Sequence, residues 1–478
     1  MEEPGDAVRG ALSRRRFLEL VGLGTAGVAL GACSSGASSS GSTVPTSTAS
    51  GGGFPLDAAK KAKGVTTITM WHSMTANNLV TLQSLVKTFN SSQSKIEVKL
   101  LAQADYTDTF TAYRTALGTK NLPDLVQMET INLQAMIDSR SIVPVEEAMA
   151  ADSSFDRADV LASAMAYFTV GGVQYAMPWN CSAQIMYYDK RLFARAGLNP
   201  DTPPTTFQEY RDMSAALKTK AGLPYGTAIK LTASNFEDWI AKTGGLLLNH
   251  ENGRQQRATA VAFDTPTGRQ IMSFLAEMFH TKLAEATLAT NFDNLLAIAN
   301  GSVGMTIETS AALGTVLKIL GGGQYHNVTL GVGPLPGLDG LGEGVPYGGA
   351  GLYIVKASSP ERQDAAWQFT KFLLSPSAMA VWAIGSGYIP ITRSSAKTAA
   401  IQHAWSATPQ YKVAYEAIAN SATNPATAGA VAGPLSQIET YLGDVLSQLS
   451  NGGSVRAALA SAATSSNQVI SSYNSSVS

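Results

Sequence analysis

The sequence is poor in cysteine and in charge. Only two of its 478 residues are cysteine, Cys33 and Cys181. Two thiols are too few for a disulfide framework or a cysteine-rich zinc site. Charged residues make up 14% of the chain, against roughly 25% in an ordinary soluble domain, and the formal net charge is −1. Because a nucleic-acid partner needs a clustered basic face, we expect no nucleic-acid partner.

Motifs of the common enzyme classes are also missing. There is no Gly-x-Ser-x-Gly elbow, no His-Glu-x-x-His helix and no Gly-Lys-Ser/Thr phosphate loop. The five histidines lie far apart, at His72, His250, His280, His326 and His403. We therefore predict no catalytic residue, no metal site and no cofactor. A secreted glycosidase or esterase stays open as an alternative, because paired carboxylates such as Glu129 and Asp189 could meet only in the fold.

Apolar runs are short, and the clearest lies near the amino terminus. Residues 18–30 are apolar and small apart from one glutamate, too few for the roughly 20 that a membrane-spanning helix needs. The preceding residues 13–18, SRRRFL, resemble a twin-arginine export signal, and residues 30–33, LGAC, resemble a bacterial lipobox. The resemblance implies that residues 1–33 are a lipoprotein signal ending at the lipidated Cys33. A chance cysteine after a small-residue turn is the alternative.

A segment rich in small polar residues follows the signal. Residues 34–53 are almost wholly Ser, Gly, Ala and Thr, and cannot bury enough apolar surface to offset their ordering entropy. We predict a flexible tether over residues 34–63, holding a folded body near the membrane surface. With Cys33 lipidated, Cys181 is a lone thiol that we expect to be buried as a small hydrophobe.

Hydrophobic periodicity predicts an α/β body after the tether. Residues 66–71 read as a strand, apolar residues recur at helical spacing over 82–89, and residues 96–100 alternate as a second strand. A strand, a helix and a strand form a βαβ unit, which is typical of a mainly parallel sheet. The same patterns predict strands at 123–128, 331–336 and 352–355, and helices at 106–118, 361–374, 435–449 and 455–473.

Aromatic and amide side chains gather in loops that follow predicted strands. These loops are Trp71-His72-Ser73, Asp105-Tyr106, Met128-Glu129, Trp179-Asn180-Cys181-Ser182 and Ser386-Gly387-Tyr388. Open α/β sheets bind ligands beyond the carboxyl ends of their strands. Rings stack on the C–H faces of polar solutes, while carboxylates and amides meet their hydroxyls. Although any one of these residues could be an ordinary core or surface residue, together they favour a cleft for a polar ligand.

Six short segments occur in a fixed order across residues 64–450. They are residues 65–74 (VTTITMWHSM), 185–190 (IMYYDK), 196–207 (AGL…PPTTF), 300–305 (NGSVGM), 348–350 (GGA) and 386–392 (SGYIPIT). In this order they resemble the extracellular solute-binding proteins of ABC importers, in the sugar and glycerol-3-phosphate-binding branch. The resemblance implies a two-lobed α/β fold of the periplasmic-binding-protein type II, with lobes joined by crossing hinge strands. The implied boundaries are approximately 64–178 with 351–400 for lobe 1, and 183–346 with 401–478 for lobe 2.

The resemblance also implies ligand contacts, and the sequence departs from the family at two places. The implied contacts are Tyr106, Glu129, Ser182, Thr309 or the adjacent Ser310, Gly349 and Tyr388. The loop tryptophans Trp71 and Trp179, and Glu439, are further candidate ligand contacts. Glu439 stands where the family member places an arginine on phosphate, and no arginine occurs between Arg393 and Arg456. The tryptophan pair expected soon after residues 187–188 is missing too. Because a carboxylate repels a phosphate, a neutral or zwitterionic carbohydrate-like solute is favoured over glycerol 3-phosphate.

These observations predict a lipid-anchored binding protein at the outer face of the cytoplasmic membrane. We expect a monomer that binds a small polar solute without altering it, and whose partners are an ABC permease and its ATPase subunits. Ligand contacts in both lobes would favour the closed state over the open one. A peptide- or metal-binding lipoprotein of the same architecture is the remaining alternative.

Overall fold

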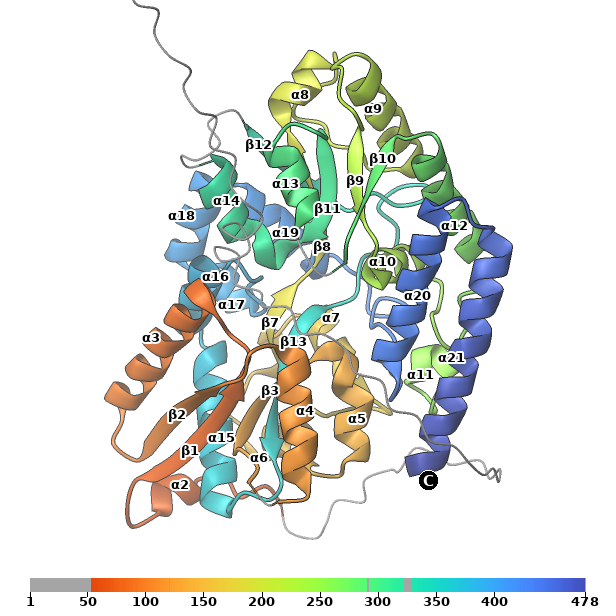
Figure 1. The fold of residues 1–478 in the computed structure, drawn as a ribbon. Coiled ribbons are helices and arrows are strands. Elements are labelled where there is room, and N and C mark those ends of the chain that lie inside the picture. The colour runs from red at the N-terminus through yellow and green to blue at the C-terminus, as the bar shows by residue number, and fades with distance from the viewer. Residues whose placement is uncertain (1–52, 120, 290–291, 322–327, 478) are drawn as a thin grey trace, which may run out of the picture.

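The computed structural model describes residues 53–119, 121–289, 292–321 and 328–477. The predicted signal with Cys33, and most of the predicted tether, lie outside these residues. The described chain forms two lobes, each built on its own sheet, with long helices α20 (Leu435–Ser450) and α21 (Val455–Val477) beside them (Figure 1). No helix in the described ranges is long and apolar enough to cross a bilayer.

The sheet of the first lobe is mainly parallel with one long antiparallel strand. Its strands are β1 (Thr66–His72), β2 (Ile96–Ala102), β3 (Leu125–Glu129), β4 (Ile142–Val143), β7 (Met177–Ser182) and β13 (Gly348–Val355). The order is β2-β1-β3-β13-β4, with β7 paired to β13. β1 runs parallel to β2 and β3, whereas β13 runs antiparallel to β3, β4 and β7.

The sheet of the second lobe repeats this plan. Its strands are β8 (Gln184–Asp189), β9 (Thr227–Lys230), β10 (Ala284–Thr287), β11 (Met305–Thr309) and β12 (Leu330–Pro334), in the order β10-β9-β11-β8-β12. β9 runs parallel to β10 and β11, and β8 runs antiparallel to β11 and β12. A short hairpin of β5 (Thr169–Val170) and β6 (Val173–Gln174) stands apart from both sheets.

The chain crosses between the two lobes at β7, β8 and β13. Only Ala183 separates β7 in the first sheet from β8 in the second, and β13 returns the chain to the first sheet. In each sheet the antiparallel strand, β13 or β8, therefore comes directly after a strand of the other lobe. Figure 1 shows β7 and β13 between the lower sheet and the upper one. This arrangement is the two-lobed fold with crossing hinge strands that the resemblance implied.

Helices cover the faces of both sheets. Around the first lobe are α2 (Ala58–Lys61), α3 (Ala76–Ser92), α4 (Tyr106–Leu117), η1 (Thr130–Asn132), α5 (Leu133–Asp138), α6 (Val145–Ala151), η2 (Arg157–Asp159), α7 (Ala162–Tyr167), α15 (Pro360–Leu374), α16 (Pro376–Ser386), α17 (Arg393–Ala396) and α18 (Ala399–Ala407). Around the second are α8 (Lys190–Arg195), α9 (Phe207–Thr219), α10 (Ala233–Lys242), α11 (Asn249–Gly253), α12 (Pro266–His280), α13 (Asp293–Ala299), η3 (Ser310–Ala312), α14 (Leu313–Gly321) and α19 (Gln410–Ala419). Helices α20 and α21 pack on each other and on α12.

Every strand and helix predicted from periodicity is present, with ends shifted by a few residues. The stripe in α20 is buried at Leu435, Ile438, Leu442, Val445, Leu446 and Leu449, so it is core packing. Cys181 is fully buried, as expected of a lone thiol, and burial raises its pKa well above the ordinary value.

The predicted extent of the tether is wrong at its carboxyl end. Phe54 is buried, residues 58–61 form α2, and Ala59 is fully buried against α15. The Ala59 N–H donates to the Asp364 carboxylate at 2.9 Å. One aromatic ring and one buried hydrogen bond therefore attach a segment that composition alone marked as unstructured. The folded body begins about ten residues before Gly64.

Candidate functional site

Two cavities lie between the lobes, close to the crossing strands. The first, which we call the acidic cavity, has a volume of about 310 Å³. Five predicted site residues line it: Glu129, Ser182, Thr309, Gly349 and Glu439. They come from β3, β7 and β13 of the first lobe and from β11 and α20 of the second. The structure thus brings together, from both lobes, residues that are up to 310 positions apart in the sequence.

The second cavity, which we call the Tyr388 cavity, has a volume of about 360 Å³. Its lining includes Tyr106, Tyr388 and Thr309, so Thr309 lines both cavities. Asp105 caps α4 by accepting a hydrogen bond from the Asp108 N–H at 2.7 Å. This cap starts the helix at Tyr106 and fixes where the tyrosine leaves the backbone.

A buried chain of hydrogen bonds supports Tyr106 from behind. The Tyr106 hydroxyl accepts from Asn180 Nδ2 at 2.7 Å, and Asn180 Oδ1 accepts from Gln127 Nε2 at 2.8 Å. Gln127 Oε1 accepts from the Ser73 N–H at 3.0 Å. This chain runs from Ser73, just after β1, through Gln127 of β3 to Asn180 of β7, so three strands hold Tyr106 in place.

Trp179 supports the site without lining it. Its ring stacks on Trp382 with centroids 4.3 Å apart, and Trp382 stacks on Tyr388 with centroids 5.6 Å apart. Within the described chain, the linings of these two cavities do not include Trp71, Trp179 or Ser310. Ser310 instead holds Ala183, the residue between β7 and β8. Its N–H donates to the Ala183 carbonyl at 2.8 Å, and its Oγ accepts from the Ala183 N–H at 3.1 Å.

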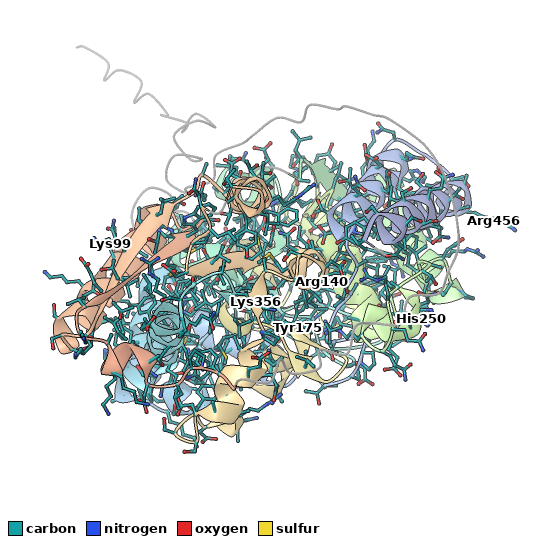
Figure 2. The ribbon with its side chains drawn as sticks, turned by 90° about the horizontal axis from the view of Figure 1, so that it is seen from below. Lys99, Arg140, Tyr175, His250, Lys356 and Arg456 are labelled. Atoms are coloured by element: carbon teal, nitrogen blue, oxygen red, sulfur yellow. The ribbon has the colours of Figure 1, made fainter. Side chains whose placement is uncertain are left out.

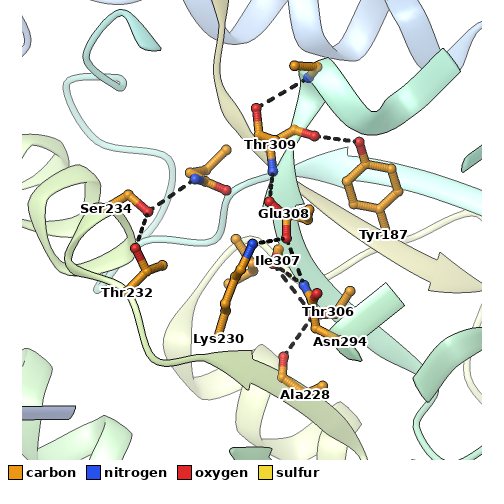
Figure 3. A network of polar contacts seen from close by, with 12 residues as sticks. Tyr187, Ala228, Lys230, Thr232, Ser234, Asn294, Thr306, Ile307, Glu308 and Thr309 are labelled. Carbon is orange, nitrogen blue, oxygen red and sulfur yellow. Dashed lines mark hydrogen bonds and ion pairs between the residues drawn. The ribbon is translucent and has the colours of Figure 1, made fainter. Parts of the chain in front are cut away.

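Thr309 is fixed by a polar network at the end of β11 (Figure 3). Its N–H donates to Glu308 Oε1 at 2.9 Å, and its carbonyl accepts from the Tyr187 hydroxyl at 2.9 Å. Glu308 is in turn paired with Lys230 at 2.9 Å and accepts from Asn294 Nδ2 at 3.2 Å. The network leaves the threonine little freedom at the point where the two cavities meet.

Gly349 is required by the approach of two strands. Its φ is +109°, a conformation that L side chains rarely adopt, and a Cβ there would lie 2.0 Å from the Asn180 carbonyl oxygen. Gly349 pairs with Cys181 across β13 and β7, at the crossing itself. The missing side chain therefore serves the packing of the hinge strands, in addition to opening the backbone toward the cavity.

Two acidic residues of the acidic cavity were not predicted from the sequence. Glu237 and Asp238 lie on α10, and Ser234, Glu237, Asp238 and Ala241 all line the cavity. Their spacing of three, four and seven residues places them on one face of the helix. The signal in the sequence was the spacing, which places Ser234, Glu237 and Asp238 on the face of the helix opposite Phe236, Trp239 and Ile240.

The carboxyl groups of the acidic cavity are hard to ionise. Burial, with the nearby Asp105 charge, raises the pKa of Glu129 to about 7. Burial likewise raises the pKa of Glu237 to about 7. The pKa of Glu439 is raised well above its ordinary value by burial and by Glu237 and Glu129. Burial and Glu237 raise that of Asp238, while Lys242 opposes the shift. Several acids therefore share one enclosed site, and the ionisation of one makes the ionisation of its neighbours less favourable.

The described residues contain no group of three or more His, Cys, Asp or Glu that could hold a metal ion. His250 lies near the periphery of the molecule in the view from below (Figure 2). The arrangement suits hydrogen bonding to a polar molecule, with acceptors from both lobes.

Comparison with known proteins agrees with this geometry. A model of the family described as bacterial extracellular solute-binding protein matches residues 84–412. The chain belongs to this family. Its members bind a solute, so the expectation that the chain is not an enzyme is confirmed.

The relatives share most of the chain. It is 27% identical over 414 residues to the sn-glycerol-3-phosphate-binding periplasmic protein UgpB of Salmonella typhimurium, covering 85% of this chain and 92% of that protein. The sugar-binding protein MalE of Xanthomonas citri is similar in structure, with a TM-score of 0.73, 22% identity and coverage of 86% and 98%. UgpB of Mycobacterium tuberculosis, solved with glycerophosphocholine, has a TM-score of 0.70, 21% identity and coverage of 86% and 100%. These structures confirm the two-lobed α/β fold.

Proposed function

We propose that this chain is the substrate-binding lipoprotein of an ABC transporter. It captures a carbohydrate-like polar solute, either a sugar or a glycerol-phosphate-type compound such as a glycerophosphodiester, by hinge closure. It delivers the solute unchanged to the permease and its ATPase subunits. The names of the relatives, which bind sugars, glycerol 3-phosphate or glycerophosphocholine, support this class of solute.

The observation that carries the proposal is that both lobes line one cavity beside the crossing strands. Glu129 and Ser182 face it from the first lobe, and Thr309 and Glu439 from the second. A solute touching all four would bridge the lobes and favour their closed arrangement, which the permease then recognises.

Isothermal titration against sugars, polyols and glycerophosphodiesters tests this function. We expect one compound to bind one-to-one with a dissociation constant in the micromolar range, about −8 kcal/mol. The compound should be recovered chemically unchanged. Silence across the whole panel, or turnover of the bound compound, would contradict the proposal.

The anchor is tested separately. Residues 1–33 resemble a twin-arginine lipoprotein signal, and lipidation of Cys33 would hold the exported body on the outer face of the cytoplasmic membrane. Cys33→Ala should release the protein from the membrane fraction into the medium, whereas Cys181→Ala, which changes the buried thiol, should leave it in place. Retention of the Cys33→Ala variant in the membrane would show that the lipobox interpretation is wrong.

A further inference from the structure

The carboxyl groups of the acidic cavity have no evident counter-charge in its lining. Glu129, Glu237, Asp238 and Glu439 all line the cavity, and within the described part of the chain the lining contains no lysine, arginine or histidine. Lys242, one turn after Asp238 on α10, is a nearby cation, and it is only 6% exposed. Arg254 is a second buried cation; it packs on the ring of Tyr167 and donates to the Gly429 carbonyl. Two cations cannot offset four acids, so the cavity carries excess negative potential when these groups ionise.

Two of these acids are also without hydrogen-bond partners. Glu237 Oε1 is buried and has no partner among the described residues. Asp238 is only 8% exposed, and no hydrogen bond or ion pair joins it to another described residue. Buried polar groups in folded proteins are ordinarily satisfied, and buried charges are ordinarily paired. Two adjacent acids that face a cavity unpaired therefore indicate donors or positive charge that arrive with the ligand.

We infer that the solute presents a cationic nitrogen, a protonated amine or a quaternary ammonium, to the four carboxyl groups of the acidic cavity. The inference rests on the proposed function and names the class of solute that this site takes. A cation within the cavity would relieve the mutual repulsion among the acids. The ring of Tyr347 lines the same cavity, and aromatic faces attract such a group. The ring of Tyr167, also in the lining, already packs against Arg254 at 5.4 Å.

Other ligand chemistries fit the cavity less well. A phosphate placed against these acids would meet repulsion in an enclosed site with no lining cation to offset it. A metal ion is disfavoured, because no metal-holding group occurs among the described residues. A neutral sugar could donate hydroxyl hydrogen bonds, but it brings no positive charge to offset Glu129, Glu237 and Glu439 when they ionise. The test therefore compares the binding of a cationic solute with the binding of a neutral sugar.

Matched pairs of probes distinguish these cases by titration calorimetry of the full chain without its signal. One pair is D-glucosamine and D-glucose, and another is glycerophosphocholine and glycerophosphoglycerol, which share a phosphodiester and differ in the cation. We expect the cationic member of at least one pair to bind about 10-fold or more tightly than its partner. If the member without a cation binds equally well or better, the inference is overturned while the proposed function stands. If no compound in the wider panel binds, both fail.

Substitution locates the cation within the cavity. Glu237→Gln keeps the shape of the side chain and removes its charge, so it should lower the affinity for the cationic probe about 10-fold. The matched control is Glu277→Gln on α12, whose carboxylate is exposed and pairs with Arg211 at 3.2 Å. The control should leave the affinity unchanged. Circular dichroism and thermal unfolding show that both variants fold. An unchanged affinity in a folded Glu237→Gln variant would overturn the inference.

Proton release gives a readout that a purely structural role would not produce. A cation favours the ionised form of Glu129, Glu237, Asp238 and Glu439, so binding near pH 7 should release protons. The observed heat should then differ between phosphate and Tris buffers, which have different ionisation enthalpies. Binding of the cationic probe with no proton release would contradict its placement beside these acids.

Discussion

At the scale of single residues, the site depends on a glycine that no other residue can replace. Gly349 combines a φ of +109° with a position only 2.0 Å from the Asn180 carbonyl for any added Cβ. Asn180 also carries the hydrogen bond to Tyr106. A side chain at residue 349 would therefore disturb the hinge strands and the tyrosine together.

Gly349→Ala should lower the free energy of unfolding by at least about 2 kcal/mol, through positive-φ strain and the forced shift of β7. It should also weaken solute binding. Gly118→Ala is the matched control, since a Cβ at this residue, just after α4, has only one neighbour, at 3.9 Å. Thermal unfolding and titration calorimetry measure both effects. Equal stability of the two variants would contradict the role given to Gly349.

At the scale of elements, β9, β11 and α13 hold Thr309 through the pair of Lys230 and Glu308. The side chain of Lys230 is 13% exposed and that of Glu308 is 4% exposed, so the pair is largely removed from water. Breaking such a pair leaves an uncompensated buried charge.

Lys230→Met should destabilise the protein by roughly 3–5 kcal/mol, because Glu308 then loses its counter-charge. The double variant Lys230→Met with Glu308→Gln should recover part of this stability, since no lone charge stays buried. Chemical denaturation of the two single variants and the double variant measures the coupling. Additive losses would show that the two side chains do not act as a pair.

The sequence predicted the elements well and the site in part. Strands β1, β2 and β3 and helices α3, α15 and α20 have strong apolar periods, so local pattern located them. The resemblance pointed to Glu129, Thr309 and Glu439, which the structure places around one cavity. The sequence did not identify Glu237 and Asp238 as site residues, because α10 faces the cavity only after β8 and β9 have been assembled into the sheet. Likewise, the sequence could not show that Trp179 supports the site without lining it, because Trp179 stacks on Trp382, which lies on a helix about 200 residues away.

At the scale of the whole molecule, the lobes are tied away from the crossing strands as well as at them. Arg257, between α11 and α12, makes two hydrogen bonds of 2.8 and 2.6 Å to Asp138 at the end of α5. The Tyr473 hydroxyl of α21 donates to the same carboxylate at 2.8 Å. One acid of the first lobe is thus shared by two donors that pack with the second.

Asp138→Asn should shift the lobes toward a more open arrangement, because it weakens two charge-assisted contacts between them. Small-angle scattering of the unliganded variant should give a larger radius of gyration than that of the parent protein. Asp212→Asn on α9 serves as a control, because its carboxylate is exposed on the second lobe. An unchanged radius in the Asp138→Asn variant would show that this contact does not set the distance between the lobes.

The acidic cavity should also make stability depend on pH. The pKa of Glu129 and of Glu237 is about 7 in the fold, above the ordinary 4.5. The folded state therefore binds more protons between these values, and stability should fall as pH rises from about 4.5 to 7. Burial lowers the pKa of His72 to about 4, which has the opposite effect between 4 and 6.5.

The difference between the parent protein and the variant carrying Glu129→Gln and Glu237→Gln separates the two effects, because His72 is common to both. The parent should lose stability relative to this variant as pH rises from 5 to 8, as followed by thermal unfolding at each pH. Parallel melting curves across this range would contradict the raised pKa values.

A crystal structure of the protein with the solute identified by calorimetry would show directly where the solute binds. We expect the solute to lie intact in the acidic cavity, in contact with Glu129 of the first lobe and with Glu237 or Glu439 of the second. A solute bound to one lobe alone, or outside this cavity, would contradict this prediction.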